Sequence, residues 1–130
     1  MKLNIDRMDH FVITVADRER TAAFYRDVLG MTIKPFGNDR LAIHFGEHKI
    51  NIHVRGAELA PYAAAPTPGS ADVCFITPVP VEEVAQWLSS KGIAVELGPV
   101  SCTGATGPLT SVYLRDPDGN LIELANAGKR

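Results

Sequence analysis

The sequence lacks any long hydrophobic run, any secretory signal and any cluster of basic residues. No apolar stretch approaches the roughly 20 residues that span a bilayer, and the first ten residues, MKLNIDRMDH, contain no apolar core of a signal peptide. Lysine and arginine together number 13 against 15 aspartates and glutamates, so there is no electrostatic case for nucleic-acid binding. We therefore expect no membrane and no nucleic acid among the partners of this chain.

Cysteine is also scarce, because Cys74 and Cys102 are the only two in 130 residues. Their spacing is not that of a metal-binding motif, and it demands no disulfide. This usage is typical of a reducing compartment, so the expected location is the cytoplasm. The length fits a single domain that buries its own core.

What is present is a pattern of periodicity that occurs twice, each time as a strand, a helix and three more strands. The first half is expected to have a strand at 8–15, a helix at 18–29, and strands at 31–35, 41–45 and 49–54. The second half is expected to have a strand at 71–77, a helix at 81–91, and strands at 93–97, 109–115 and 121–125. We therefore predict an α+β fold in which two tandem βαβββ modules, at about residues 6–54 and 71–126, form one domain over 1–130.

Two stretches interrupt this pattern. Residues 55–70, RGAELAPYAAAPTPGS, have no periodicity and gather proline and alanine, so we interpret them as the connector between the modules. Residues 98–108, GPVSCTGATGP, are rich in glycine but lack the GK[ST] ending of a phosphate-binding loop. We expect this second stretch to be a flexible lid or a plain connector.

One face of nearly every expected strand is apolar, and the other face is rich in imidazole and carboxylate groups. His10 and Asp72 hold matching places in the first strand of each half, and His53 and Glu123 hold matching places in the last strand. Solvated faces would be dominated by lysine, threonine and glutamate, whereas these groups are ligands of divalent metals. We predict that the polar faces line a cavity in which these four side chains bind a metal ion.

Two segments resemble the vicinal oxygen chelate superfamily, which includes glyoxalase I, fosfomycin-resistance enzymes, extradiol dioxygenases and bleomycin-resistance proteins. They are MDHFVITVADRERTAAFYRDVLGM at 8–31 and VYLRDPDGNLIEL at 112–124. The resemblance extends over essentially the whole chain. It implies curved mixed sheets around a metal-binding cavity, often in a homodimer whose chains exchange modules. Whether the site lies within one chain or across two stays open.

By position, His10 resembles the metal ligand of the family's first strand, and Glu123 resembles the ligand of its last strand. Asp72 stands where many relatives have histidine, and His53 stands where glyoxalase I has a glutamate ligand. A carboxylate in place of an imidazole favours hard octahedral ions such as Mn, Ni, Fe(II) or Mg over tetrahedral Zn. The identity of the ion stays open.

The resemblance implies a divalent-metal-dependent lyase or isomerase of glyoxalase type, acting on a small oxygen-rich molecule by bidentate chelation and proton transfer. Glu123 would be both a ligand and the candidate base. Tyr113 and Arg115 would orient or neutralise an acidic substrate.

Two other functions fit the same family. An extradiol-type dioxygenase is favoured by Tyr113, two residues before RDPDGN, but the histidine that such enzymes have upstream is absent from 102–110, CTGATGPLT. A metal-free module that binds or sequesters a small molecule, like the bleomycin-resistance proteins, is favoured by Asp72 in place of the expected histidine. The substrate itself is not named by the sequence.

Overall fold

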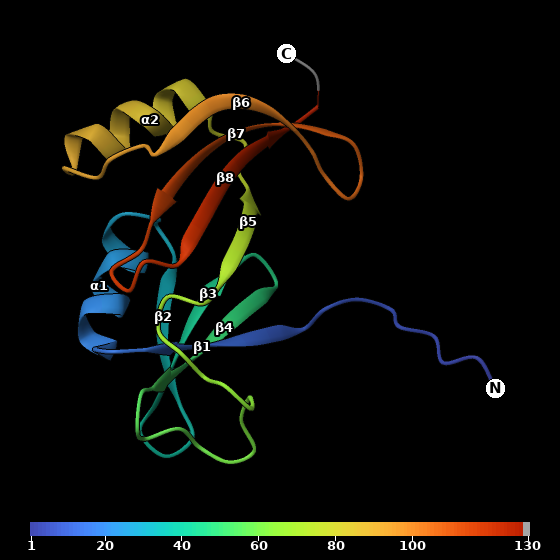
Figure 1. The fold of residues 1–130 in the computed structure, drawn as a ribbon, viewed down its shortest axis with the longest axis vertical. Helices are drawn as coiled ribbons and strands as arrows, with labels where there is room; N and C mark the ends of the chain where they lie inside the picture. Colours follow the sequence, from blue (N-terminus) through green and yellow to red (C-terminus); the bar gives the residue numbers. More distant parts are fainter. Residues whose placement is uncertain (129–130) are drawn as a thin grey trace. The chain divides into compact units, whose positions relative to one another are not determined.

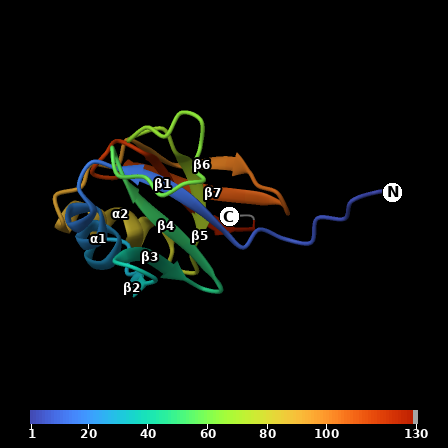
Figure 2. The same cartoon turned by 90° about the horizontal axis from the view of Figure 1, so that it is seen from below.

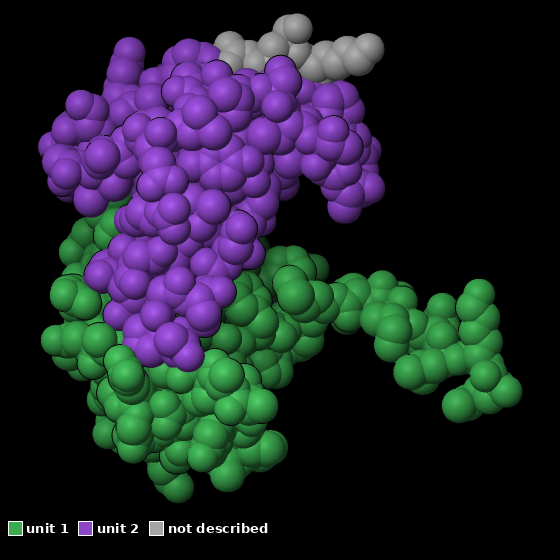
Figure 3. All heavy atoms as spheres, in the orientation of Figure 1, with its two compact units in different colours: residues 1–66 green, residues 67–130 purple. Residues whose placement is uncertain are grey.

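The chain folds into two compact units, Met1–Pro66 and Thr67–Arg130, in a computed structural model that describes residues 1–128 (Figure 3). The division between the units falls within the predicted connector, 55–70. Each unit contains a strand, a helix and three further strands in the predicted order (Figure 1). The α+β class and the duplicated βαβββ pattern are therefore confirmed.

The first unit is a four-stranded sheet with one helix. Its elements are β1 (His10–Val15), α1 (Arg18–Asp27), β2 (Thr32–Phe36), β3 (Arg40–Phe45) and β4 (His48–Val54). The strand order is β1-β4-β3-β2, with β1 parallel to β4 and the other pairs antiparallel (Figure 2). The first and last strands of the unit are therefore neighbours, and the helix and the β2–β3 hairpin lie between them in sequence.

Helix α1 and one face of this sheet form the core of the first unit. The helix begins as predicted, because the side chain of Asp17 accepts a hydrogen bond from the Arg20 amide at 3.0 Å. It ends at Asp27, two residues before the predicted end, and Gly30 follows with a φ of 70°. The apolar side chains buried in this unit are Ile13, Val15, Ala22, Phe24, Tyr25, Ala42, Ile43, Ile50 and Ile52.

The second unit repeats this architecture. Its elements are β5 (Asp72–Ile76), α2 (Val81–Ser90), β6 (Leu97–Thr103), β7 (Pro108–Arg115) and β8 (Leu121–Ala127). The strand order is β5-β8-β7-β6, with β5 parallel to β8. Val84 and Leu88 are buried on the inner side of α2, as predicted. No helix in the described chain is long and apolar enough to cross a membrane.

The prediction of a strand at 93–97 and a loop at 98–108 is wrong, because β6 occupies Leu97–Thr103. Glycine, proline, serine and cysteine give this segment little strand propensity, and pairing with the long β7 overrides that preference. The ladder shifts register between Leu97 and Val100. Gly98 lies there with a φ of 113°, and a Cβ atom on it would collide with the Ser111 carbonyl oxygen. A glycine is therefore required at this bulge.

The turn between β7 and β8 is closed by side chains as well as by backbone. Asp116 Oδ1 accepts from the amides of Asp118 at 2.9 Å and Asn120 at 3.0 Å, and Asn120 Nδ2 donates to Asp116 Oδ2 at 2.8 Å. Asn120 Oδ1 in turn accepts from the Ala71 amide at 2.9 Å, directly before β5. The turn thus holds the start of β5 beside the start of β8.

The start of α2 is capped from another strand. The N-cap residue, Pro80, makes no side-chain cap, but Asn126 of β8 accepts from the Val81 amide at 2.9 Å. The side-chain nitrogen Nδ2 of Asn126 also donates to the carbonyls of Thr77 at 2.9 Å and Val79 at 2.7 Å. One side chain therefore fixes the segment between β5 and α2 and supplies the acceptor that the helix start needs.

Candidate functional site

Glu123 lies in the middle of the sheet of the second unit, on its polar face. It belongs to β8, where its neighbours across the sheet are Cys74 of β5 and Tyr113 of β7. Its carboxylate accepts a hydrogen bond from the Ser111 hydroxyl at 2.6 Å. Because both flanking strands are hydrogen-bonded to β8, this group is held by the rigid centre of the sheet rather than by a loop.

No cation compensates the charge of Glu123 among the residues that the structure describes. The nearest arginine along β7, Arg115, is engaged elsewhere: Nε and one terminal nitrogen donate to Glu96 at 3.0 Å each. Its other terminal nitrogen donates to the Gly119 carbonyl at 3.1 Å. A half-buried carboxylate held only by neutral donors is suited to binding a cation, because desolvating an uncompensated charge costs free energy.

The groups beside Glu123 are kept protonated. Although the Cys74 side chain is exposed, its partial desolvation at the sheet, followed by the negative charge of Glu123, raises the pKa of the thiol to about 11. The hydrogen bond with Cys102, then burial and Glu123, raise the pKa of Tyr113 above its ordinary value. Cys74 and Tyr113 are therefore neutral hydrogen-bond donors near neutral pH, and Cys74 is not an activated nucleophile.

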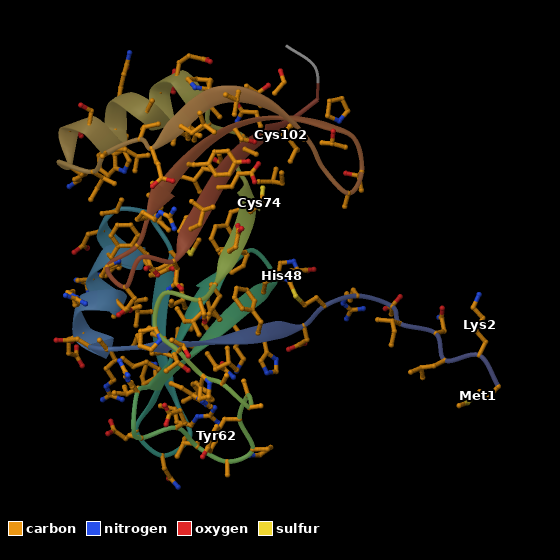
Figure 4. The ribbon with its side chains drawn as sticks, in the orientation of Figure 1. Met1, Lys2, His48, Tyr62, Cys74 and Cys102 are labelled. Atoms are coloured by element: carbon orange, nitrogen blue, oxygen red, sulfur yellow. The ribbon has the colours of Figure 1, made fainter. Side chains whose placement is uncertain are left out.

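Cys102 is a member of this cluster that the sequence analysis missed. Its sulfur lies 3.3 Å from the Tyr113 hydroxyl. The prediction placed it in a loop, whereas β6 brings it onto the sheet (Figure 4). The alternation of Val100 and Cys102 with Ser101 and Thr103 was the available signal in the sequence, and the glycine and proline of the segment concealed it.

Asp72 and Arg115 lie at the edge of this cluster. Asp72 begins β5, two residues before Cys74, and its side chain is exposed. Arg115 is also exposed. Its ion pair with Glu96 holds the pKa of the Glu96 carboxyl below its usual range. Arg115 would have to release Glu96 before it met an acidic substrate, so its role in substrate binding stays a prediction.

In the first unit, His10 is oriented by its neighbour. Its Nδ1 lies 2.7 Å from Asp9 Oδ1. A carboxylate on one ring nitrogen leaves the other, Nε2, available to a ligand, which is the usual arrangement around metal-binding histidines. His10 is thus suited to the role predicted for it.

The register of the strands corrects the predicted match between His53 and Glu123. Asp72 pairs with Leu121, two residues before Glu123, and its counterpart His10 pairs with Lys49. The counterpart of Glu123 is therefore two residues after Lys49, which is Asn51. His53 pairs with Thr14 instead, and Thr14 lies four residues after His10, which is roughly 13 Å along β1.

Both Asn51 and His53 are buried, with 5% and 6% of their surfaces exposed. Asn51 Oδ1 has no hydrogen-bond partner within the part of the chain that the structure describes. A buried oxygen without a donor suits a hard cation or a hydrogen-bonding ligand. Asn51 is a candidate that the sequence analysis missed, because an asparagine in a strand carries no signal of its own.

The donors fit a divalent ion in chemistry, and each unit supplies part of the predicted set. The second unit offers the carboxylates of Asp72 and Glu123, and the first offers His10 together with His53 or Asn51. Among residues 1–128, no group of three or more histidine, cysteine, aspartate and glutamate side chains is placed to hold a metal ion. The four-residue site therefore stays a prediction.

Two βαβββ units, each with its first and last strands paired in parallel and with polar groups on one sheet face, define the vicinal oxygen chelate fold. The chain belongs to the glyoxalase/bleomycin resistance protein/dioxygenase superfamily, whose family profile matches residues 7–124.

Two relatives are similar over nearly the whole chain. Virulence protein STM3117 of Salmonella typhimurium is 49% identical over 125 residues, covering 96% of this chain and 87% of the relative. The crystal structure of that virulence protein superposes on this chain with a TM-score of 0.95, and the match covers 97% of this chain and 100% of the other. Glyoxalase domain-containing protein RDO1 of Mycosarcoma maydis is 46% identical, covering 96% of this chain and 70% of the relative.

The fold is shared more widely. TnmS3, an antibiotic binding protein from Streptomyces sp. CB03234, has a TM-score of 0.77 at 20% identity, over 98% of this chain and 100% of its own. At that identity the likeness concerns the fold alone.

Proposed function

We propose that this protein is a divalent-metal-dependent lyase or isomerase of glyoxalase type that acts on a small oxygen-rich molecule. The observation that supports the proposal is the carboxylate of Glu123, which is half-buried, fixed by Ser111 at 2.6 Å and uncompensated by a cation among the described residues. Such a group has the chemistry of a metal ligand and of a general base.

His10, Asp72 and Glu123 would hold the ion, with His53 or Asn51 as a further ligand. A bound divalent ion would polarise neighbouring oxygens of the substrate and stabilise negative charge on them. Glu123 would take a proton from substrate carbon with the carboxylate oxygen that Ser111 leaves free. Tyr113, whose raised pKa keeps it protonated, would donate a hydrogen bond to a substrate oxygen.

Metal binding tests this proposal directly. Purified protein is stripped with chelator, reloaded separately with Mn, Ni, Fe(II), Zn and Mg, and analysed for bound metal. We expect about one ion per chain for at least one metal and a rise in melting temperature with that metal, since an ion bound only by the folded state stabilises it. Glu123→Gln should abolish both effects.

Glu83→Gln is the matched control, because Glu83 is an exposed carboxylate in the first turn of α2. It should bind metal as the parent does. Less than about 0.1 ion per chain with every metal would end the proposal, because a ligand set with useful affinity would be filled under these conditions.

A metal-free module that binds or sequesters a small molecule is the second candidate. Asp72 favours it because it replaces the histidine that many relatives have, and Asn51 favours it because a neutral amide oxygen binds a divalent ion less strongly than a glutamate carboxylate does. The antibiotic binding protein TnmS3 has the same fold at 20% identity. A melting temperature unchanged by chelator and by every metal, with tight binding of an organic ligand, would favour this candidate.

We also propose that the protein is a cytoplasmic homodimer. Both cysteines are free, which suits a reducing compartment. The segment before β1 exposes Leu3, Ile5 and Met8, with 71%, 76% and 57% of their surfaces accessible. Several exposed apolar side chains along one extended segment are typical of a surface that another chain covers.

A further inference from the structure

The sheet of the first unit carries charge of one sign. Strands β1 to β4 contain no aspartate or glutamate. Its polar face bears three cations, Lys34, Arg40 and Lys49. Paired residues share a face of the sheet, and Lys34 pairs with Ala42, Ala42 pairs with Asn51, and His44 pairs with Lys49. Arg40 lies two residues before Ala42 on the same strand, so its side chain is on this face as well. His10 and His44 lie on the same face.

Two of these cations gather on one aromatic ring. The guanidinium carbon of Arg40 lies 4.4 Å from the centroid of the Phe36 ring, and Lys49 Nζ lies 4.2 Å from it. The ring attracts both charges, so like-charged side chains are kept together instead of spreading into solvent. Arg40 and Lys49 are half-buried, and Lys34 is exposed.

None of the three cations forms an ion pair with a carboxylate in the described chain. Two acids next to these strands are engaged elsewhere. Asp39 binds Arg18 at 2.9 Å, and Asp9 contacts His10 at 2.7 Å and interacts with Lys49 only through the charge of the lysine. Arg40 Nε is buried and has no hydrogen-bond partner among the residues described. A buried guanidinium donor without an acceptor is rare, because its desolvation is left uncompensated.

The positive charges of this face act on the imidazole of His44. Burial, followed by the positive charges of Lys34 and Lys49, lowers the pKa of its imidazole. Lys34 of β2 and Lys49 of β4, the two strands that flank β3, therefore act on one point of the sheet. A face with this field attracts anions.

We propose that the polar face of the first unit binds a small organic anion through Arg40, Lys49 and Lys34. The ligand group is a carboxylate or a phosphate, because both offer the acceptor oxygens that a guanidinium and ammonium groups recognise. Arg40 Nε would gain the acceptor that it lacks, and the charges held over Phe36 would be neutralised. The inference concerns residues of the first unit and requires no metal, so it is independent of the proposed lyase function.

The test uses full-length protein stripped of metal, titrated at low ionic strength with inorganic phosphate and, separately, with malonate. Binding is followed by calorimetry and by amide chemical shifts. We expect saturable binding with shifts at residues 34, 40 and 49. Arg40→Gln and Lys49→Gln should each weaken it about tenfold, because each removes a charge-assisted contact.

Lys91→Gln is the matched control, since Lys91 Nζ lies 4.7 Å from the Trp87 ring centroid on α2 of the second unit. It removes a lysine from an aromatic ring without touching the proposed site, and it should leave binding unchanged. Unaltered amide spectra away from the substitution show that Arg40→Gln is folded. If Arg40→Gln is not folded, the Lys49→Gln variant tests the site instead.

Binding of phosphate alone would identify a phosphoryl ligand, and binding of malonate alone would identify a carboxylate ligand. Binding of both would show that the site recognises negative charge. Each outcome supports the proposal. It is overturned if neither anion saturates, or if Lys91→Gln weakens binding as much as Arg40→Gln does.

Discussion

The carboxylate of Glu123 contributes to keeping the groups beside it protonated. It adds to burial in raising the pKa of Cys74 to about 11, and it contributes to the raised pKa of Tyr113. Both groups are therefore protonated near neutral pH. The polar face of the second unit thus presents the carboxylates of Asp72 and Glu123, with neutral donors beside Glu123, in contrast to the cationic face of the first unit.

Alkylation of Cys74 reports this coupling. In a Cys102→Ser background, roughly 0.1% of Cys74 is thiolate at pH 8 if its pKa is about 11. Its reaction with iodoacetamide should therefore be slow, and the rate should rise with pH throughout the range 7–10. Glu123→Gln removes the negative charge and lowers the pKa of Cys74, so alkylation should become several-fold faster.

The rates are measured by mass spectrometry at fixed reagent concentration, with Glu83→Gln as the control that removes a distant carboxylate. Equal rates in the Glu123→Gln variant and its parent would show that the carboxylate does not act on the thiol.

The helix α2 depends on a residue that the sequence does not associate with it. Asn126 lies 45 positions after Val81, yet it accepts the hydrogen bond that a local cap would otherwise accept. It also holds the carbonyls of Thr77 and Val79. The segment between β5 and α2 is therefore stabilised by the last strand of the unit.

Asn126→Ala should destabilise the protein by about 1–3 kcal/mol, because it leaves the Val81 amide and the Thr77 carbonyl without a partner. Asn126→Asp keeps the acceptor for Val81 and loses the two donors, so it should cost less. Urea denaturation measures both. A change within about 0.5 kcal/mol for the alanine variant, the range of an ordinary surface substitution, would contradict the capping role.

The elements with strong periodicity could be predicted from the sequence, and those fixed by pairing could not. Asp17 and Gly30 marked the bounds of α1 because their effects are local. The strand β6 escaped prediction because its partner β7, and not its own residues, determines it. The match of His53 with Glu123 failed by two residues, because register depends on which residues pair across β1 and β4, and counting along a single strand does not reveal it.

The segment before β1 belongs to no helix or strand in the described chain and extends away from the sheet of the first unit (Figures 1 and 2). Met1, Leu3 and Ile5 alternate along it with Lys2, Asn4 and Asp6, as in a strand with one apolar face. It continues directly into β1, which is an edge of its sheet. An extended segment of this kind is suited to pairing with a second copy of the chain.

Replacing Leu3 and Ile5 together by aspartate should shift a dimer toward monomer, because two charges would have to be buried in the interface. Analytical ultracentrifugation over a range of concentrations measures the dissociation constant. Leu59→Asp, at a position with 49% of its surface exposed in the segment after β4, should leave assembly unchanged. A parent protein that is monomeric at every concentration would refute the homodimer.

The parallel pairing of first and last strands sets an order of events during synthesis. The first sheet needs β4, so its ladder with β1 is available once residue 54 has left the ribosome. The second sheet has β8 at an interior position between β5 and β7, yet β8 is made last. Until residue 127 is translated, β5 has no neighbour in its own sheet. Nascent chains of the second unit therefore leave open the two backbone edges, one on β5 and one on β7, that β8 later covers, and chaperones would have to shield them.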